Sequence, residues 1–479
     1  MLLGLLQQTT QRNPAQPALI CGGSSIPYQT LYEQVGGVYH GLKRLGVGQG
    51  DTIVVALPNS AEFVLSFYAA AALGALLLPL NPFLSDREMT RYISEHPGTT
   101  AIITDGAWLQ RWQQTVDQVH GPGTPAARAI ALVAINAGGP AAAGPEAADP
   151  SAAVDFQTFL QQPAPALPRR EYSGDFLLQY SSGSTGAPKL LRRTQANLFH
   201  QAQNCTQTIG VAPTDAILAL VPLYHAYGIG ECLLAATATG AALVIAEPAM
   251  EENQPVQTPF VFRRDYILEL IDRHRVTILP LVPYMVSVLA ATPPDHPASL
   301  ASVRWCFSAG TFLTEEVFAQ FRRRWGIAVR QLYGCTEAGA VAVNLEAENG
   351  MAYNAIGQPM ANVDIRIVDD EGRSLPAGQV GQLAIQSRTI AAGHAQMHLA
   401  GVEMAGVEMA AANGHGTLGH GTGRHRAGEH GAGGYFLTGD LARRDAQGRI
   451  YIVGRQRSQR MTAQHKSGPL ERDPALQEA

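Results

Sequence analysis

Short apolar runs alternate with helix-length segments through most of the 479 residues, and this alternation limits the possible folds. Strands that alternate with helices predict an α/β protein with largely parallel sheets. Ligands of such proteins bind at loops that follow the carboxyl ends of the strands. The expected strands include Thr52–Leu57, Ala101–Thr104, Ala216–Val221, Ala241–Ile245 and Val276–Leu281, and the expected helices include Tyr28–Leu45, Asp86–Glu95, Asp265–His274 and Glu315–Trp325.

One apolar stretch, Phe63–Leu80, is about long enough to cross a membrane. Its first half is rich in Ala and its second half is rich in Leu, and Pro79, Asn81 and Pro82 lie at its end. This composition favours a buried helix that runs into a buried strand. We therefore expect no transmembrane segment.

Composition narrows the class of protein. Hydrophobic residues make up 46% and charged residues 15%, as in a well-buried globular chain, and the length suggests one large domain or two to three lobes. The formal net charge is −5 and the sequence contains no stripe of basic residues, so we expect no nucleic-acid partner. The 5 cysteines are scattered without a metal-binding spacing, and the amino-terminal residues do not resemble a signal peptide. These features predict a cytoplasmic protein.

Two stretches depart from the alternation. Residues 134–152 are rich in Ala, Gly and Pro and predict a surface linker. Residues 395–433 contain a tandem GVEMA repeat and a Gly-rich tract, which predict a disordered insertion. Six of the 14 histidines fall between His394 and His430. A His-rich tract can bind metal, but the irregular spacing favours incidental affinity over a built site.

The segment Leu177–Lys189 combines an apolar run with small hydroxylated residues, glycines and a final lysine. Backbone N–H groups and hydroxyls at such a strand end can bind phosphate oxygens, and glycine permits close approach. The spacing is not that of a Walker A loop, and an ordinary Ser/Gly turn is the alternative. The candidate phosphate-binding residues are Ser181, Ser182, Gly183, Ser184, Thr185, Gly186 and Lys189.

Read together with four further segments, this loop resembles the signature of the adenylate-forming superfamily, which includes acyl- and aryl-CoA synthetases. The resemblance extends to about residue 455, in the family's order. It implies a large multi-lobed adenylation domain over 1–455, with a smaller β-rich lobe, and a remnant of the family's C-terminal subdomain over 456–479. The further segments are SAGTFLT (308–314), QLYGCTEAGA (331–340), IGQP (356–359) and YFLTGDLARRDAQGRIYIVGR (435–455).

The resemblance implies ATP and Mg²⁺ as cofactors and assigns a role to each matching position. Residues Ser181–Lys189 would hold the β- and γ-phosphates, and Glu337, with Thr185, would ligate Mg²⁺. Two non-functional alternatives stay open: Asp440 could form an Asx-turn, and Glu337 could be a carboxylate stabilised at a helix amino terminus. The remaining implied roles are the adenine-side loop at Gly310, adenine packing on Tyr333, α-phosphate binding by Thr336, and ribose binding by Asp440 and Arg455.

The implied reaction joins a small-molecule carboxylic acid to AMP and then transfers the acyl group to a thiol. His225 matches the family position near the carboxylate, with a core histidine as the alternative. No acidic residue lies between Pro222 and Gly230, which argues against an amino-acid substrate. A mainly apolar pocket for a fatty or aryl acid is expected, with a catalytic set of Lys189, Thr185, Glu337 and His225. Its expected walls are His225, Tyr227, Val282, Pro283, Ser308, Ala309, Gly334 and Cys335.

The end of the sequence departs from the family pattern. HKSGPLE (465–471) resembles part of the family's C-terminal hairpin, but its catalytic lysine has no counterpart in 456–479. We therefore expect a truncated subdomain, with a lid supplied by a partner chain as one possibility. Three readings stay open: a ligase that uses CoA, an acyl-AMP ligase that loads the phosphopantetheine thiol of an acyl carrier protein, and a pseudoenzyme that binds nucleotide without full turnover.

Overall fold

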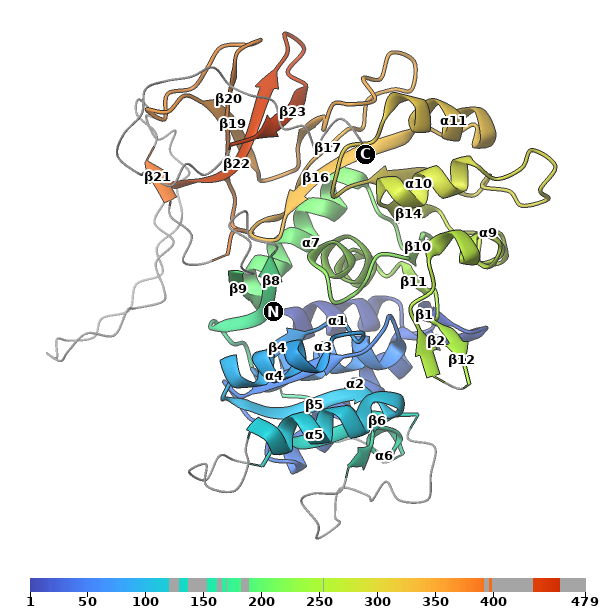
Figure 1. Ribbon diagram of the computed structural model, residues 1–479, viewed down its shortest axis with the longest axis vertical. Coiled ribbons are helices and arrows are strands. Elements are labelled where there is room, and N and C mark those ends of the chain that lie inside the picture. Colours follow the sequence, from blue (N-terminus) through green and yellow to red (C-terminus); the bar gives the residue numbers. More distant parts are fainter. Residues whose placement is uncertain are drawn as a thin grey trace, which may run out of the picture. The chain divides into compact units, whose positions relative to one another are not determined.

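The computed structural model describes residues 1–119, 129–136, 153–161, 166–168, 170–181, 189–252, 254–391, 396–398 and 434–456 (Figure 1). The chain divides into two compact units. The large unit comprises residues 1–363, 387–392 and 449–451. The small unit comprises residues 364–386, 393–448 and 452–479.

Nine of the described strands of the large unit form one sheet, and its central strands, from β16 to β1, are parallel. Strands β2, β17 and β18 pair antiparallel at its two edges. The strand order is β18 (Gln358–Pro359), β17 (Gly339–Val343), β16 (Val329–Cys335), β15 (Trp305–Ser308), β14 (Ile278–Leu281), β10 (Ala216–Ala219), β11 (Ala242–Ile245), β1 (Pro17–Cys21) and β2 (Ser24–Pro27).

A second sheet of the large unit contains seven strands among the residues that the structure describes. Neighbouring strands in this sheet pair in parallel, except β8 and β9, which form an antiparallel hairpin. The order is β7 (Val154–Asp155), β6 (Ala131–Ile135), β5 (Thr99–Asp105), β3 (Thr52–Ala56), β4 (Leu76–Pro79), β8 (Asp175–Ser181) and β9 (Lys189–Thr194). A short hairpin of β12 (Ala249–Glu251) and β13 (Gln254–Val256) stands apart from both sheets.

Helices fill the space between the two sheets and cover their outer faces (Figure 1). The shared core contains both sheets together with α1 (Leu2–Arg12), α2 (Tyr28–Arg44), α3 (Ala61–Leu73), α7 (Gln195–Ile209), the π-helix η2 (Gly228–Leu234) and α8 (Ala235–Thr239). Helices α4 (Asp86–Glu95) and α5 (Leu109–Val119), with η1 (Gly106–Trp108), cover the smaller sheet. Helices α9 (Arg264–Arg273), α10 (Pro283–Ala290) and α11 (Glu315–Trp325), with η3 (Phe260–Arg263), cover the larger sheet, and α6 (Gln157–Leu160) packs on α2.

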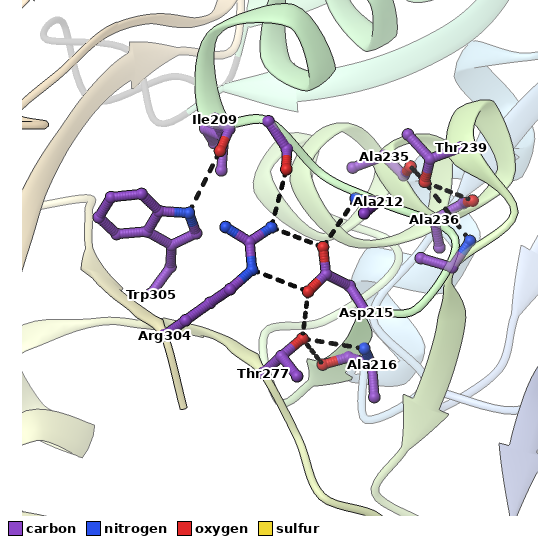
Figure 2. Close-up of polar contacts among 12 residues, drawn as sticks. Ile209, Ala212, Asp215, Ala216, Ala235, Ala236, Thr239, Thr277, Arg304 and Trp305 are labelled. Carbon is purple, nitrogen blue, oxygen red and sulfur yellow. Dashed lines mark hydrogen bonds and ion pairs between the residues drawn. The ribbon is translucent and has the colours of Figure 1, made fainter. Parts of the chain in front are cut away.

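The amino ends of three parallel strands are joined by one buried carboxylate (Figure 2). Asp215, which precedes β10, accepts hydrogen bonds from Arg304 Nε at 2.8 Å and Nη2 at 2.5 Å, and from Thr277 Oγ1 at 2.7 Å. Its fourth donor is the Ala212 backbone N–H at 2.7 Å. Burial alone would raise the pKa of Asp215, but the hydrogen bonds from Arg304, Ala212 and Thr277 outweigh burial and hold the pKa below its ordinary value. The ionised Asp215 carboxylate therefore links the amino ends of β10, β14 and β15 through hydrogen bonds and an ion pair.

The small unit contains only strands and loops among its described residues. Its sheet has the order β19 (Asp364–Val368), β20 (Val380–Gln386), β22 (Gly434–Arg444) and β21 (Gln396–His398), and β23 (Ile450–Arg455) also pairs with β22. This agrees with the β-rich lobe that the family resemblance implies. Strand β21 lies inside the 395–433 stretch, so the expectation of disorder does not apply to these three residues.

The predicted fold class is confirmed: parallel-rich sheets alternate with helices, and the bounds of α4 and α11 agree with the expected ranges. The Phe63–Leu80 stretch forms α3 followed by β4, as expected for a buried helix and strand. No helix among the described residues is both long and apolar enough to cross a membrane. Most of the predicted linker at 134–152, most of the 395–433 insertion and nearly all of 456–479 lie outside the described residues.

Candidate active site

The carboxyl ends of β10, β14, β15 and β16 lie at one edge of the larger sheet, because these neighbouring strands are parallel. This is the edge at which open α/β sheets bind ligands. Each strand is followed by a segment that the sequence marked as a candidate. They are Pro222–Tyr227 after β10, Val282–Pro283 after β14, Ala309–Gly310 after β15, and Thr336–Glu337 after β16.

The hairpin of β16 and β17 presents the second signature segment. The pairing shifts register between Tyr333 and Gly334, and a Cβ atom on Gly334 would lie 2.5 Å from the Gly339 carbonyl oxygen. Only glycine fits at position 334, because there is no room for a side chain. Thr336 and Glu337 lie half-buried in the turn, and a strand follows them. Glu337 is thus not a carboxylate at a helix amino terminus, which excludes that alternative.

The acid-binding segment, which we define as residues 222–230 with the candidates His225 and Tyr227, is anchored at its start by Asn59. The Asn59 side chain accepts a hydrogen bond from the Leu223 N–H at 2.7 Å and donates to the Ala219 and Val221 carbonyls at 3.0 Å and 3.1 Å. A Cβ atom at Gly228 would lie 2.2 Å from the Pro222 oxygen, so this segment folds closely onto itself. The arrangement fixes the backbone that carries His225 and Tyr227.

His225 and Tyr227 differ in environment. More than a third of the His225 residue surface is exposed, yet partial burial of its ring lowers its pKa. The Tyr227 hydroxyl is buried and has no hydrogen-bond partner among the residues that the structure describes. Ser308 Oγ, another predicted pocket wall, is also buried and without a partner in the described part of the chain. Such buried hydroxyls are uncommon and call for a ligand or a water molecule.

Behind Tyr227 lies a small cavity of about 10 Å³, room for about one water molecule. Most of its lining is apolar, but Glu231 and Tyr227 contribute to it. Of the expected walls of the acid pocket, only Tyr227 lines this cavity, so the mainly apolar pocket stays a prediction. The lining residues are Cys205, Ile209, Val211, Ile217, Tyr227, Glu231, Ile278, Pro280, Phe307 and Leu332.

Two of the phosphate-loop candidates, Ser181 and Lys189, lie on the β8–β9 hairpin. Ser181 ends β8 and Lys189 begins β9, and the two residues pair in register. The side chain of Gln179 on β8 donates to the Tyr224 carbonyl at 3.3 Å, so this hairpin contacts the acid-binding segment. Lys189 is exposed. The intervening candidates Ser182, Gly183, Ser184, Thr185 and Gly186 lie outside the described residues.

Behind the hairpins is a set of buried polar residues that sequence reasoning missed. Arg193 on β9 is only 1% exposed, and Glu231 in η2 is 6% exposed. Gln201 Nε2 of α7 donates to Glu231 Oε1 at 2.7 Å. Burial raises the pKa of Glu231 to about 7, although Gln201 and the Arg193 charge oppose the rise. Burial lowers the pKa of Arg193 to about 10, against the attraction of Glu231, Cys335 and Glu337.

The Gln201 amide fits between two glycines. A Cβ atom on Gly230 would lie 1.8 Å from Gln201 Nε2, and one on Gly339 would lie 2.3 Å from Gln201 Cδ. Gly339 also has a φ of +70°, which disfavours other residues. The strand pattern of Leu191 to Arg193 did contain one signal: alternation turns Arg193 to the same face as the buried Leu191.

The small unit holds the two ribose candidates. Asp440 lies on β22 and Arg455 ends β23, and Arg455 Nε is 3.7 Å from Asp440 Oδ1. The Asp440 side chain is 19% exposed and the Arg455 side chain is 62% exposed. The Thr438 hydroxyl accepts a hydrogen bond from the Asp440 N–H at 3.0 Å. The pair thus places a guanidinium close to a carboxylate that can accept hydrogen bonds.

Within the described ranges, no group of three or more His, Cys, Asp or Glu side chains could hold a metal ion. The predicted Mg²⁺ site depends on Glu337 and on Thr185, and Thr185 is outside those ranges. The magnesium prediction therefore remains a prediction.

Loops gathered at the carboxyl edge of a parallel sheet define a ligand-binding α/β protein. The chain belongs to the AMP-binding enzyme family, whose pattern matches residues 6–394. The expected resemblance to adenylate-forming enzymes is thereby confirmed.

Curated relatives carry names of acid–CoA ligases. A 4-coumarate–CoA ligase of Humulus lupulus is 29% identical over 79% of this chain and 66% of its own length. A 4-coumarate–CoA ligase of Arabidopsis thaliana is 31% identical over 78% of this chain and 64% of its own length. A sulfoacetate–CoA ligase of Cupriavidus necator is 27% identical over 99% of this chain and 82% of its own length. The chain thus spans somewhat less than two thirds of the plant relatives.

Solved structures of similar proteins support the fold. The anthranilate CoA ligase AuaEII in complex with anthranoyl-AMP matches 95% of this chain and 77% of its own, with a TM-score of 0.73 and 21% identity. The N-terminal domain of FACL13 from Mycobacterium tuberculosis matches 95% of this chain and 99% of its own, with a TM-score of 0.71 and 20% identity. At these identities the likeness establishes the fold alone.

Proposed function

We propose that this protein activates a non-amino carboxylic acid as an acyl adenylate and transfers the acyl group to the thiol of CoA. The observation that carries the proposal is the gathering of the acid-binding segment, the β15 loop and the Glu337 turn at one carboxyl edge. The β8–β9 hairpin contacts the same edge through Gln179 and Tyr224. Membership of the AMP-binding enzyme family supports a nucleotide as the second substrate.

The residues present fit a nucleotide. Gly310 has a φ of +94° and is exposed, and a Cβ atom there would meet nothing nearer than 3.9 Å, so the backbone is open to a flat ring. Tyr333 is half-buried and would pack against adenine. Glu337 and Thr336 would present hard oxygen atoms to a magnesium ion and to the α-phosphate. A bound Mg²⁺ would neutralise phosphate charge during the reaction.

In the proposed first step, an oxygen of the substrate carboxylate attacks the α-phosphorus of ATP. The bond from this phosphorus to the bridging oxygen of pyrophosphate breaks, and pyrophosphate leaves with the electron pair. The chain would contribute positioning: the anchored backbone at Asn59 fixes His225 near the carboxylate, and Lys189 stands at the phosphate hairpin. Asp440 and Arg455 keep the ribose role that the family resemblance implies.

In the proposed second step, the thiol of CoA attacks the acyl carbonyl carbon and AMP leaves. The named relatives support CoA as the acceptor and an aryl acid as the substrate.

The test is mass spectrometry of products after the chain is incubated with ATP, Mg²⁺ and a panel of aryl and fatty acids, with and without CoA. We expect acyl-AMP without CoA and acyl-CoA with it. Acyl-AMP that passes to an acyl carrier protein but not to CoA would refute the CoA assignment. Absence of acyl-AMP with every acid, despite ATP binding, would refute the proposed activity and favour the pseudoenzyme.

Glu337→Gln should lower acyl-AMP formation by at least about 10²-fold, because a charge aimed at the phosphates is lost. The matched control is Glu316→Gln, which neutralises an exposed carboxylate in the first turn of α11 and should leave the rate unchanged. Equal rates for the Glu337 variant and the control would show that the Glu337 carboxylate has no part in the reaction.

A further inference from the structure

Arg193 is placed unusually for a charged residue. Its Nη2 donates to the Thr389 carbonyl at 3.3 Å, while Nε and Nη1 have no hydrogen-bond partner among the described residues. A buried guanidinium with unused donors is costly unless nearby charges offset the loss of water. The nearby carboxylates are Glu231 and Glu337, both of which interact electrostatically with Arg193. Its neighbour Arg192 is exposed and pairs with Asp175 at 3.4 Å.

The carbonyl that Arg193 holds belongs to the segment 387–391, which passes behind the Glu337 turn. Asn197 Nδ2 donates to two more carbonyls of this segment, those of Arg388 at 2.7 Å and Ile390 at 3.1 Å. The Ala391 N–H at the end of the segment donates to the Glu337 carbonyl oxygen at 2.7 Å. A continuous chain of hydrogen bonds therefore runs from β9 and α7, through segment 387–391, to the backbone of Glu337.

We propose that Arg193 is a positioning residue that holds Glu337 in place. It acts through its hydrogen bond to the Thr389 carbonyl and through its electrostatic attraction to Glu231 and Glu337. The proposal rests on the proposed function, in which Glu337 faces the metal and phosphates. Arg193 is buried and touches neither. It acts instead on Glu337, in the way that residues which hydrogen-bond to metal ligands orient those ligands in other proteins.

Glu231 has a distinct part in this arrangement. It is held by Gln201 and its charge is matched by Arg193, so η2 and the Glu337 turn share one buried cation. Removal of Arg193 alone would leave Glu231 buried without a counter-charge, so ionisation of Glu231 at and above pH 7 would destabilise the fold. Removal of both charges together would avoid that penalty, since a buried pair replaced as a pair costs little stability. The double change therefore separates stability from positioning.

The experiment compares Arg193→Met, Arg193→Lys and the double variant Arg193→Met/Glu231→Gln with the full wild-type chain. Arg192→Met is the matched control, because it removes an exposed arginine one residue away on the same strand. Three quantities are measured: the midpoint of thermal unfolding, kcat and KM for acyl-AMP formation, and the Mg²⁺ concentration that half-saturates ATP binding by calorimetry.

We expect Arg193→Met to lower both the unfolding midpoint and kcat, and to raise the half-saturating Mg²⁺ concentration by about 10- to 100-fold. The double variant should regain the unfolding midpoint but neither kcat nor the Mg²⁺ response, and Arg193→Lys should recover part of both. Arg192→Met should match the wild type in every measurement.

Recovery of kcat and of the Mg²⁺ response together with stability in the double variant would show a merely structural pair and overturn the proposal. So would an unchanged Mg²⁺ response in Arg193→Met. If the wild type itself forms no acyl-AMP with any acid, the proposed function fails. The calorimetric comparison then still decides whether Arg193 positions the site for metal and nucleotide.

Discussion

The Asp215 cluster at the amino ends of β10, β14 and β15 gives a prediction whose magnitude follows from its contacts. The side chain is 4% exposed and accepts four hydrogen bonds. In Asp215→Asn the amide NH₂ faces one Arg304 donor together with the donor of either Thr277 or Ala212, so about two of the four bonds are lost together with the charge. At about 1.5 kcal/mol for each bond to a charged group, the loss is about 3 kcal/mol.

The assay is urea unfolding followed by far-UV circular dichroism, with Asp265→Asn as the control. Asp265 is 71% exposed and pairs with Arg264 at 3.0 Å, so its neutralisation should cost less than about 1 kcal/mol. The same unfolding curves at several pH values provide a second readout. The folded pKa of Asp215 lies below its ordinary value of 3.8, so its stabilisation is present above that value and is lost as the pH falls through the folded pKa.

A loss below about 1 kcal/mol at pH 7, or a loss equal to that of the control, would refute the reasoning. A gap between wild type and Asp215→Asn that stayed constant down to pH 2 would also refute it. In that case folding would leave the pKa of Asp215 at its unfolded value.

Three further predictions follow from positions in the core. Gly339→Ala should cost more stability than Gly210→Ala: both have φ near +70°, but only at Gly339 would the new methyl group meet Gln201, and equal urea midpoints would contradict this. Tyr227→Phe should stabilise the protein by about 1 kcal/mol, because it removes a buried hydroxyl without a partner among the described residues; a lower melting temperature would show that the hydroxyl is satisfied. Burial raises the pKa of Glu231 to about 7, so the folded state binds the proton more tightly than the unfolded state and the free energy of unfolding should fall as pH rises from 4.5 to 7. Glu231→Gln should flatten this pH dependence, and an unchanged pH dependence would contradict the prediction.

Much of the fold was predictable because local chemistry and tertiary structure agree. Helix α4 begins where Ser85 and Glu88 form a capping box, a pattern visible in the sequence. Helix α3 begins after Ser60, whose side chain accepts the Phe63 N–H, and ends at Gly74 with a φ of +69°. These signals are local, so one sequence suffices to locate them.

The site was predictable in part. Residues at or just beyond the carboxyl ends of parallel strands, such as Ser308 and Glu337, share an edge because of topology, and the strand pattern supplied that topology. Arg193 and Glu231 were missed because their partners lie on other elements of the fold. Glu231 lies one position beyond Gly230, the end of the segment in which an acidic residue would have indicated an amino-acid substrate. The mainly apolar pocket was inferred from small side chains and stays a prediction.

The fit of Gln201 between Gly230 and Gly339 has a consequence for how this sequence can diverge. A methyl group at either glycine would collide with the amide, whereas a shorter residue at 201 would deprive Glu231 of its donor. Single substitutions at these positions are therefore expected to be deleterious, while certain combined replacements would be tolerated. The three sites, drawn from the acid-binding segment, helix α7 and the signature hairpin, should behave as an epistatic unit and change in concert between distant relatives.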